Sequence, residues 1–133
     1  MITAVDSNIL IDIFFNDKQF EAASENALKQ CLKEGVVCAC DLVWTETAIG
    51  FSDGETFFDA MHTIDIEFSA IYEKTTWVAA HVWHQYRQSG GKREKLPPDF
   101  LIGAHALTQC DRLLTRDRGF YRQYFTTLKL VTP

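Results

Sequence analysis

The sequence lacks an excess of basic residues. It carries 13 lysines and arginines against 18 aspartates and glutamates, which gives a formal net charge of -5. Proteins that bind polyanions usually show a surplus of positive charge, so this balance on its own counts against a nucleic-acid partner. A function on nucleic acid would need a specific explanation for the acidity.

The sequence lacks a C-x-x-C pair. The four cysteines are Cys31, Cys38, Cys40 and Cys110. Cys38 and Cys40 would lie on one face of a strand, and buried reduced thiols in a cytoplasmic protein are the favoured interpretation.

Long apolar runs are absent as well. No run approaches the ~18 residues that a membrane-spanning helix needs. Residues 1–6 contain no basic region and reach Asp6 too early for a signal peptide. We therefore expect a cytoplasmic protein without a membrane span.

What the sequence does contain is typical of a folded domain. Hydrophobic residues make up 47% and charged residues 23% of the 133 positions. These fractions are close to the globular average and exclude long disordered, collagen-like or coiled-coil segments. The length predicts a single domain over residues 1–133.

Strand-like and helix-like segments alternate along the chain. Strands are expected at 1–5, 36–40, 63–68, 112–115 and 128–132. Helices are expected from about 9, and at 18–34, 41–50, 52–61, 69–88, 99–108 and 118–125, with an irregular loop at 90–98. This order predicts an α/β fold with a central, mostly parallel sheet flanked by helices on both faces. Ligands of such sheets bind at the carboxyl ends of the strands.

Three carboxylates are expected at that edge. Asp6 directly follows the first strand, and Asp117 lies just past the fourth. Asp99 opens the helix before the fourth strand, which carries the chain ~15 Å away, and the strand returns it by about the same distance. Asp99 and Asp117 should therefore lie close together.

Glu46 is the fourth candidate. Its neighbours one helical turn away include Leu42, Val43 and Ile49, which predicts a carboxylate on the apolar face of a helix that Asp41 would cap. Asp59, by contrast, has polar neighbours and is expected on the surface. An unpaired buried charge costs several kcal/mol, so Glu46 needs a partner such as a metal ion.

An oxygen-only donor set favours Mg²⁺ or Mn²⁺ over zinc. Such ions suit phosphodiester hydrolysis. Asn8, Ser7 and Thr115 can orient a carboxylate or a water molecule. The alternative is that Asp6, Asp99 and Asp117 only cap helices and turns.

Four segments together carry a family resemblance. They are VDSNILID at 5–12, WTET at 44–47, PDFLIGAHAL at 98–107 and LLTRDRGF at 113–120. Their order and spacing resemble those of PIN-domain ribonucleases, and most closely the toxin subunits of VapBC-type toxin–antitoxin pairs.

The resemblance implies a PIN-like fold, one or two Mg²⁺ or Mn²⁺ ions per chain, endonucleolytic cleavage of RNA, a homodimer and a cognate antitoxin. The family's acidic quartet falls on Asp6, Glu46, Asp99 and Asp117, and its supporting polar positions fall on Asn8 and Thr115. Two residues depart from the usual pattern. Ser7 stands where threonine is common, and His105 stands where a smaller residue is usual.

Basic residues gather in two places. Contacts to RNA phosphates are one interpretation and solvated charges are the other. The candidates are Lys92, Arg93 and Lys95, beside Arg87, together with Arg116 and Arg118, which flank Asp117. His81 and His84 lie three residues apart on one helix, where a surface or packing role is favoured over metal binding.

The main hypothesis is therefore a metal-dependent endoribonuclease that acts as a toxin. The alternatives are a PIN-fold RNA-processing nuclease without a toxin role, a non-catalytic binding module and a phosphoacceptor domain that holds one Mg²⁺. Assigning four negative charges to a metal pocket leaves the rest of the chain nearly neutral, so the acidity no longer opposes an RNA substrate.

Overall fold

The structure, a computed structural model, describes residues 1–90 and 97–133, in which five strands alternate with seven helices. The strands are β1 (Ile2–Val5), β2 (Val36–Cys40), β3 (Ile66–Ser69), β4 (Arg112–Leu114) and β5 (Leu130–Val131). The helices are α1 (Ser7–Phe14), α2 (Glu21–Glu34), α3 (Asp41–Ala48), α4 (Gly54–Thr63), α5 (Glu73–Gln88), α6 (Pro97–Gln109) and α7 (Arg118–Tyr124). The predicted α/β fold is confirmed.

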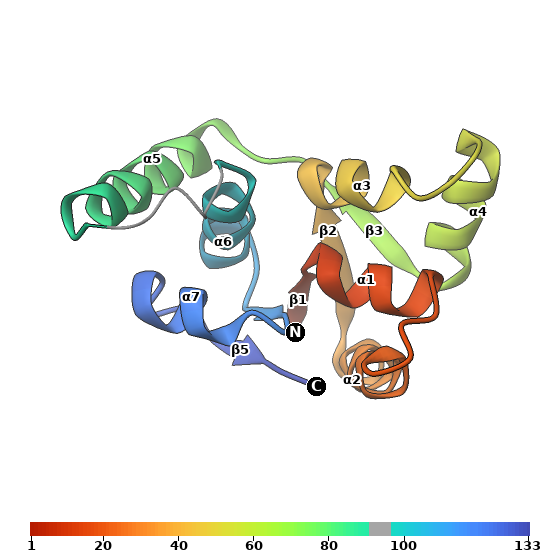
Figure 1. Cartoon of the computed structure of the whole chain (residues 1–133). Helices are drawn as coiled ribbons and strands as arrows, with labels where there is room; N and C mark the ends of the chain where they lie inside the picture. Colours follow the sequence, from red (N-terminus) through yellow and green to blue (C-terminus); the bar gives the residue numbers. More distant parts are fainter. Residues whose placement is uncertain (91–96) are drawn as a thin grey trace.

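The sheet is parallel throughout and has the strand order β3-β2-β1-β4-β5. The chain first builds outward from β1 to β3 and then crosses back to β4. Because parallel crossovers are right-handed, this reversal sends α1 to α4 to one face and α5 to α7 to the other. Figure 1 shows the two groups on opposite sides of the strands. The order reverses between β1 and β4, where ligands of parallel sheets bind.

Register brings the two central carboxyl ends together. Val5 of β1 pairs with Leu114 of β4, and the Asp6 amide donates to the Leu114 carbonyl at 2.9 Å. The residues that follow the two strands, Asp6 and Thr115, therefore start from the same point of the sheet edge.

Several predicted boundaries were wrong by a few residues. Asp41 was expected to cap α3, but it is the first helical residue, and Cys40 is the cap. The third strand was expected at 63–68, but α4 continues to Thr63 and Asp65 adopts a positive φ of 55°, so β3 begins only at Ile66.

The helix at 99–108 also proved longer, because α6 already begins at Pro97. Proline is tolerated in a first helical turn, where its missing N–H has no partner to lose. Of the predicted loop at 90–98, positions 91–96 lie outside the described residues.

The core is apolar and lies on both faces of the sheet. Its fully buried members include Ile9, Val37, Phe100 and Leu113. No helix in the described part of the chain is both long and apolar enough to cross a membrane.

Candidate active site

Asp6 is the centre of the site. It caps α1, and its side chain is 6% exposed. Its carboxylate accepts hydrogen bonds from the Ser7 amide at 2.8 Å, the Thr115 hydroxyl at 2.8 Å and the Tyr121 hydroxyl at 3.3 Å. Burial nevertheless raises the pKa of Asp6, and the charge of Asp99 adds to that rise. The hydrogen bonds therefore fix the position of the Asp6 carboxylate, while burial and the charge of Asp99 destabilise its negative charge.

Asn8 and Thr115 join the ends of β1 and β4. The Asn8 side-chain Nδ2 donates to the Thr115 hydroxyl and to Asp6, each at 3.4 Å. The Asn8 side-chain Oδ1 accepts from the Arg116 backbone amide at 3.3 Å. Thr115 is fully buried and accepts from the Asp117 amide at 3.0 Å. Both residues lie beside the carboxylates that the sequence predicted them to support.

Glu46 reaches the same edge from α3. It is half-buried and accepts a hydrogen bond from the Ser7 hydroxyl at 3.2 Å. Its pKa is raised by burial first and then by the negative charges of Asp6 and Asp99. The prediction that Ile49 lies on the same inward face as Glu46 was wrong, because Ile49 is 81% exposed.

Tyr121 is a residue of the site that was not among the residues predicted from the sequence. It is buried on α7, one helical turn after Asp117, and donates to Asp6. Its pKa is raised well above the ordinary value by burial and by the charges of Asp6, Asp99 and Asp117. The phenol therefore stays protonated and lies within the field of three carboxylates. Its spacing of four residues from Asp117 was the available signal.

Asp12 was also missed. It is buried on α1 and accepts hydrogen bonds from Ser24 at 2.7 Å and from the Arg116 guanidinium at 2.7 and 2.9 Å. Arg116 also lies over the Phe20 ring, 4.0 Å from its centroid. Asp12 recurs one turn after Asn8, which was a usable signal for an inward-facing acid.

The remaining predicted RNA contacts differ in their surroundings. Arg116 is half-buried and is held by Asp12, whereas Arg118 is exposed at the start of α7. Lys92, Arg93 and Lys95 lie outside the described residues. His81 and His84 are exposed on α5, as the surface interpretation predicted.

Residues 3–126 match the family model of the PIN domain. The chain belongs to the PIN domain family. A comparison with curated proteins finds no match.

Solved structures with a similar fold include chains of three VapBC complexes. One is VapBC2 from Rickettsia felis bound to a promoter DNA fragment, with a TM-score of 0.78, 19% identity and coverage of 99% of this chain and 98% of the other. VapBC-1 from nontypeable Haemophilus influenzae matches with a TM-score of 0.75, 16% identity and the same coverages. DNA-bound VapBC from Salmonella typhimurium matches with a TM-score of 0.69, 12% identity and the same coverages.

PIN domains generally use divalent metal ions, and the donor set of this PIN domain fits such an ion. Asp6 and Glu46 are carboxylates whose pKa values are raised by burial and by neighbouring negative charge. A divalent cation would offset both effects. All donors are oxygens, the chemistry that suits Mg²⁺ or Mn²⁺. Among the described residues, the acids do not form a group of three whose ligand atoms all lie within 4.8 Å of one another.

The raised pKa of Glu46 predicts a specific pH dependence of metal-free stability. The Glu46 carboxylate binds a proton more readily in the native state than in the unfolded chain. Glu46 therefore lowers the free energy of unfolding as the pH rises from its unfolded pKa, about 4.3, through its higher folded pKa. Glu46→Gln should therefore gain stability relative to wild type over that rise. Urea unfolding in EDTA at a series of pH values measures the difference.

The exposed Asp59 of α4 supplies a matched control, because Asp59→Asn also removes one acidic group. A difference between Glu46→Gln and wild type that stays constant or shrinks as pH rises would contradict the prediction.

Proposed function

We propose that this PIN domain is a metal-dependent endoribonuclease that hydrolyses RNA phosphodiester bonds with Mg²⁺ or Mn²⁺. The observation that carries the proposal is the buried Asp6 carboxylate, which lies where the strand order reverses and whose pKa is raised by burial and by Asp99. A helix-capping role for Asp6 does not explain why a second acid, Glu46, lies close enough for the charge of Asp6 to raise its pKa.

Asp6, Glu46, Asp99 and Asp117 would hold one or two ions. When bound, such ions supply Lewis acidity toward water and phosphate. The chain's own groups orient the donors: Thr115 and Tyr121 donate to Asp6, and the Ser7 hydroxyl donates to Glu46. Arg118 is exposed directly after Asp117 and offers positive charge to a phosphate.

We expect the purified protein to cut single-stranded RNA in Mg²⁺ or Mn²⁺ and to lose that activity in EDTA. Mapping the cut ends by primer extension would establish internal cleavage, and restoring the ion should restore the rate. An unstructured RNA pool avoids dependence on an unknown target sequence. Intact RNA under all metal conditions would refute the nuclease proposal and leave a non-catalytic module.

We further propose that the nuclease is the toxin of a toxin–antitoxin pair and forms a homodimer in the cytoplasm. The fold similarity to chains of VapBC complexes supports the toxin role. The free cysteines support a reducing compartment such as the cytoplasm. Exposed apolar side chains also support a protein partner, and they include Ile49 at 81%, Trp77 at 75% and Phe58 at 51% exposed.

Expression in a bacterial host separates the toxin role from RNA processing. The toxin proposal predicts growth arrest that Asp6→Asn abolishes. Normal growth beside intact RNA cleavage in vitro would instead favour a PIN-fold RNA-processing nuclease.

A further inference from the structure

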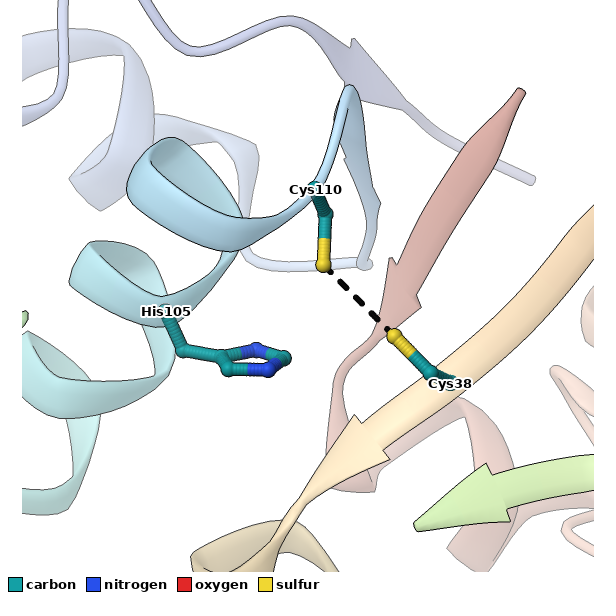
Figure 2. A group of neighbouring side chains, drawn as sticks. All are labelled: Cys38, His105 and Cys110. Carbon is teal, nitrogen blue, oxygen red and sulfur yellow. Dashed lines mark hydrogen bonds between the residues drawn. The ribbon is translucent and has the colours of Figure 1, made fainter. Parts of the chain in front are cut away.

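A second group of potential metal ligands lies away from the acidic pocket, between the sheet and α6. Within the described residues, Cys38, His105 and Cys110 each offer one ligand atom, and these atoms all lie within 4.8 Å of one another. Cys38 belongs to β2, His105 to α6, and Cys110 follows the end of α6. Figure 2 shows the His105 ring directed toward the two sulfur atoms.

The spacing of the sulfur atoms suits a shared ion. The Sγ atoms of Cys38 and Cys110 are 3.5 Å apart, and both thiols are free. Zinc–sulfur bonds of about 2.3 Å in tetrahedral geometry place two sulfur ligands about 3.8 Å apart, whereas a disulfide requires about 2.05 Å. The observed distance is close to that of a metal site.

The surroundings also suit such a site. Cys38 is 4% exposed and His105 is 1% exposed, whereas Cys110 is half-buried, so two of the three ligands are shielded from water. One ring nitrogen of His105 lies 2.9 Å from the Ser69 hydroxyl, which fixes the orientation of the ring. Groups that hydrogen-bond to a metal-ligating histidine commonly orient its ring and raise the metal affinity of the site.

We propose that Cys38, His105 and Cys110 bind a Zn²⁺ ion. Sulfur and nitrogen donors favour this ion, in contrast to the oxygen donors of the acidic pocket. Binding releases two thiol protons to solvent, and the ion and the two thiolates then sum to zero charge, as a buried site requires. Three protein ligands leave the fourth tetrahedral position to a water molecule.

The zinc would act as a structural tie. It joins β2 to α6, and each of these elements leads to an acid of the pocket. β2 runs directly into α3, which carries Glu46, and His105 follows Asp99 by six residues, or roughly 9 Å along α6. A bound ion would therefore fix α6 against the sheet and stabilise the relative positions of Glu46 and Asp99.

Co²⁺ is a suitable probe, because thiolate coordination produces a charge-transfer absorption that carboxylates do not. We expect untagged, reduced protein to bind one equivalent of Co²⁺ with this absorption, and Zn²⁺ to displace it. Cys38→Ser and Cys110→Ser should abolish the band. Cys31→Ser, which alters a buried thiol outside the group, and Asp6→Asn, which alters the acidic pocket, should keep it.

Absence of the band in wild type, or its survival in Cys38→Ser, would overturn the proposal. A band lost in Asp6→Asn would also overturn it, because the ion would then belong to the acidic pocket. If the serine variants do not fold, alkylation of wild type followed by peptide mapping provides the test. Zn²⁺ should slow the labelling of Cys110, the half-buried thiol of the group, and labelling of Cys110 at the same rate with and without Zn²⁺ would refute the site.

Discussion

Replacing Asp6 by asparagine should lower the rate of RNA cleavage by more than about 100-fold, the upper end of the loss seen when a group that only orients a metal ligand is removed. Asp6 accepts three hydrogen bonds of 3.3 Å or less and lies in the field of Asp99. Asparagine has nearly the same shape and keeps one acceptor oxygen, but it carries no charge to hold a cation. Cleavage rates at saturating Mn²⁺ give the direct comparison.

Metal-free stability separates loss of chemistry from loss of fold. Burial raises the pKa of Asp6, so a neutral side chain relieves an unfavourable charge, and unfolding in EDTA should be unchanged or should require more denaturant. The matched control is Asp59→Asn on the exposed face of α4, which should cleave at the wild-type rate. Wild-type cleavage by Asp6→Asn, or an equal loss in Asp59→Asn, would exclude Asp6 from the catalytic centre.

The convergence at Asp6 was predictable because it depends on simple geometry. A residue that directly follows a parallel strand must lie at the carboxyl edge of the sheet. A helix that precedes a parallel strand begins near the edge at which that strand ends, so an acid at the start of the helix lies at the same edge. Asp6, Asp99 and Asp117 therefore needed no knowledge of packing. Glu46 needed only helical periodicity, although the exposure of Ile49 shows how coarse that periodicity is.

The missed residues depend on contacts between distant segments. Asp12 is inward-facing because Ser24 and Arg116 meet it, across separations of 12 and 104 residues. The Cys38–Cys110 contact spans 72 residues and exists only because α6 packs against β4 and β1, which places Cys110 near β2. Helical spacing can indicate that Asp12 faces inward, but local sequence patterns do not identify partners that lie far apart in the chain. The order of strands and helices can be predicted without knowledge of such partners.

Replacing Asp12 by alanine should destabilise the fold by about 3 kcal/mol, the lower end of the effect of breaking a buried ion pair. The Asp12 side chain is 2% exposed and the Arg116 side chain 30% exposed, so the loss should fall below that of a fully buried pair. The change also leaves the buried Ser24 hydroxyl without its 2.7 Å acceptor. In thermal unfolding, about 3 kcal/mol corresponds to a Tm drop on the order of 10 °C for a chain of this length.

Glu25→Gln is the control, because Glu25 pairs with Lys29 on the surface of α2 at 43% and 63% exposure. Loss of that pair should change stability by less than about 0.5 kcal/mol. A similarly small change in Asp12→Ala would show that the Asp12–Arg116 pair contributes little to the fold. Arg116→Met then distinguishes the two roles of the arginine: unchanged stability with weaker RNA binding would assign it to the substrate, whereas a loss that parallels Asp12→Ala would assign it to anchoring the Thr115–Asp117 segment beside Asn8.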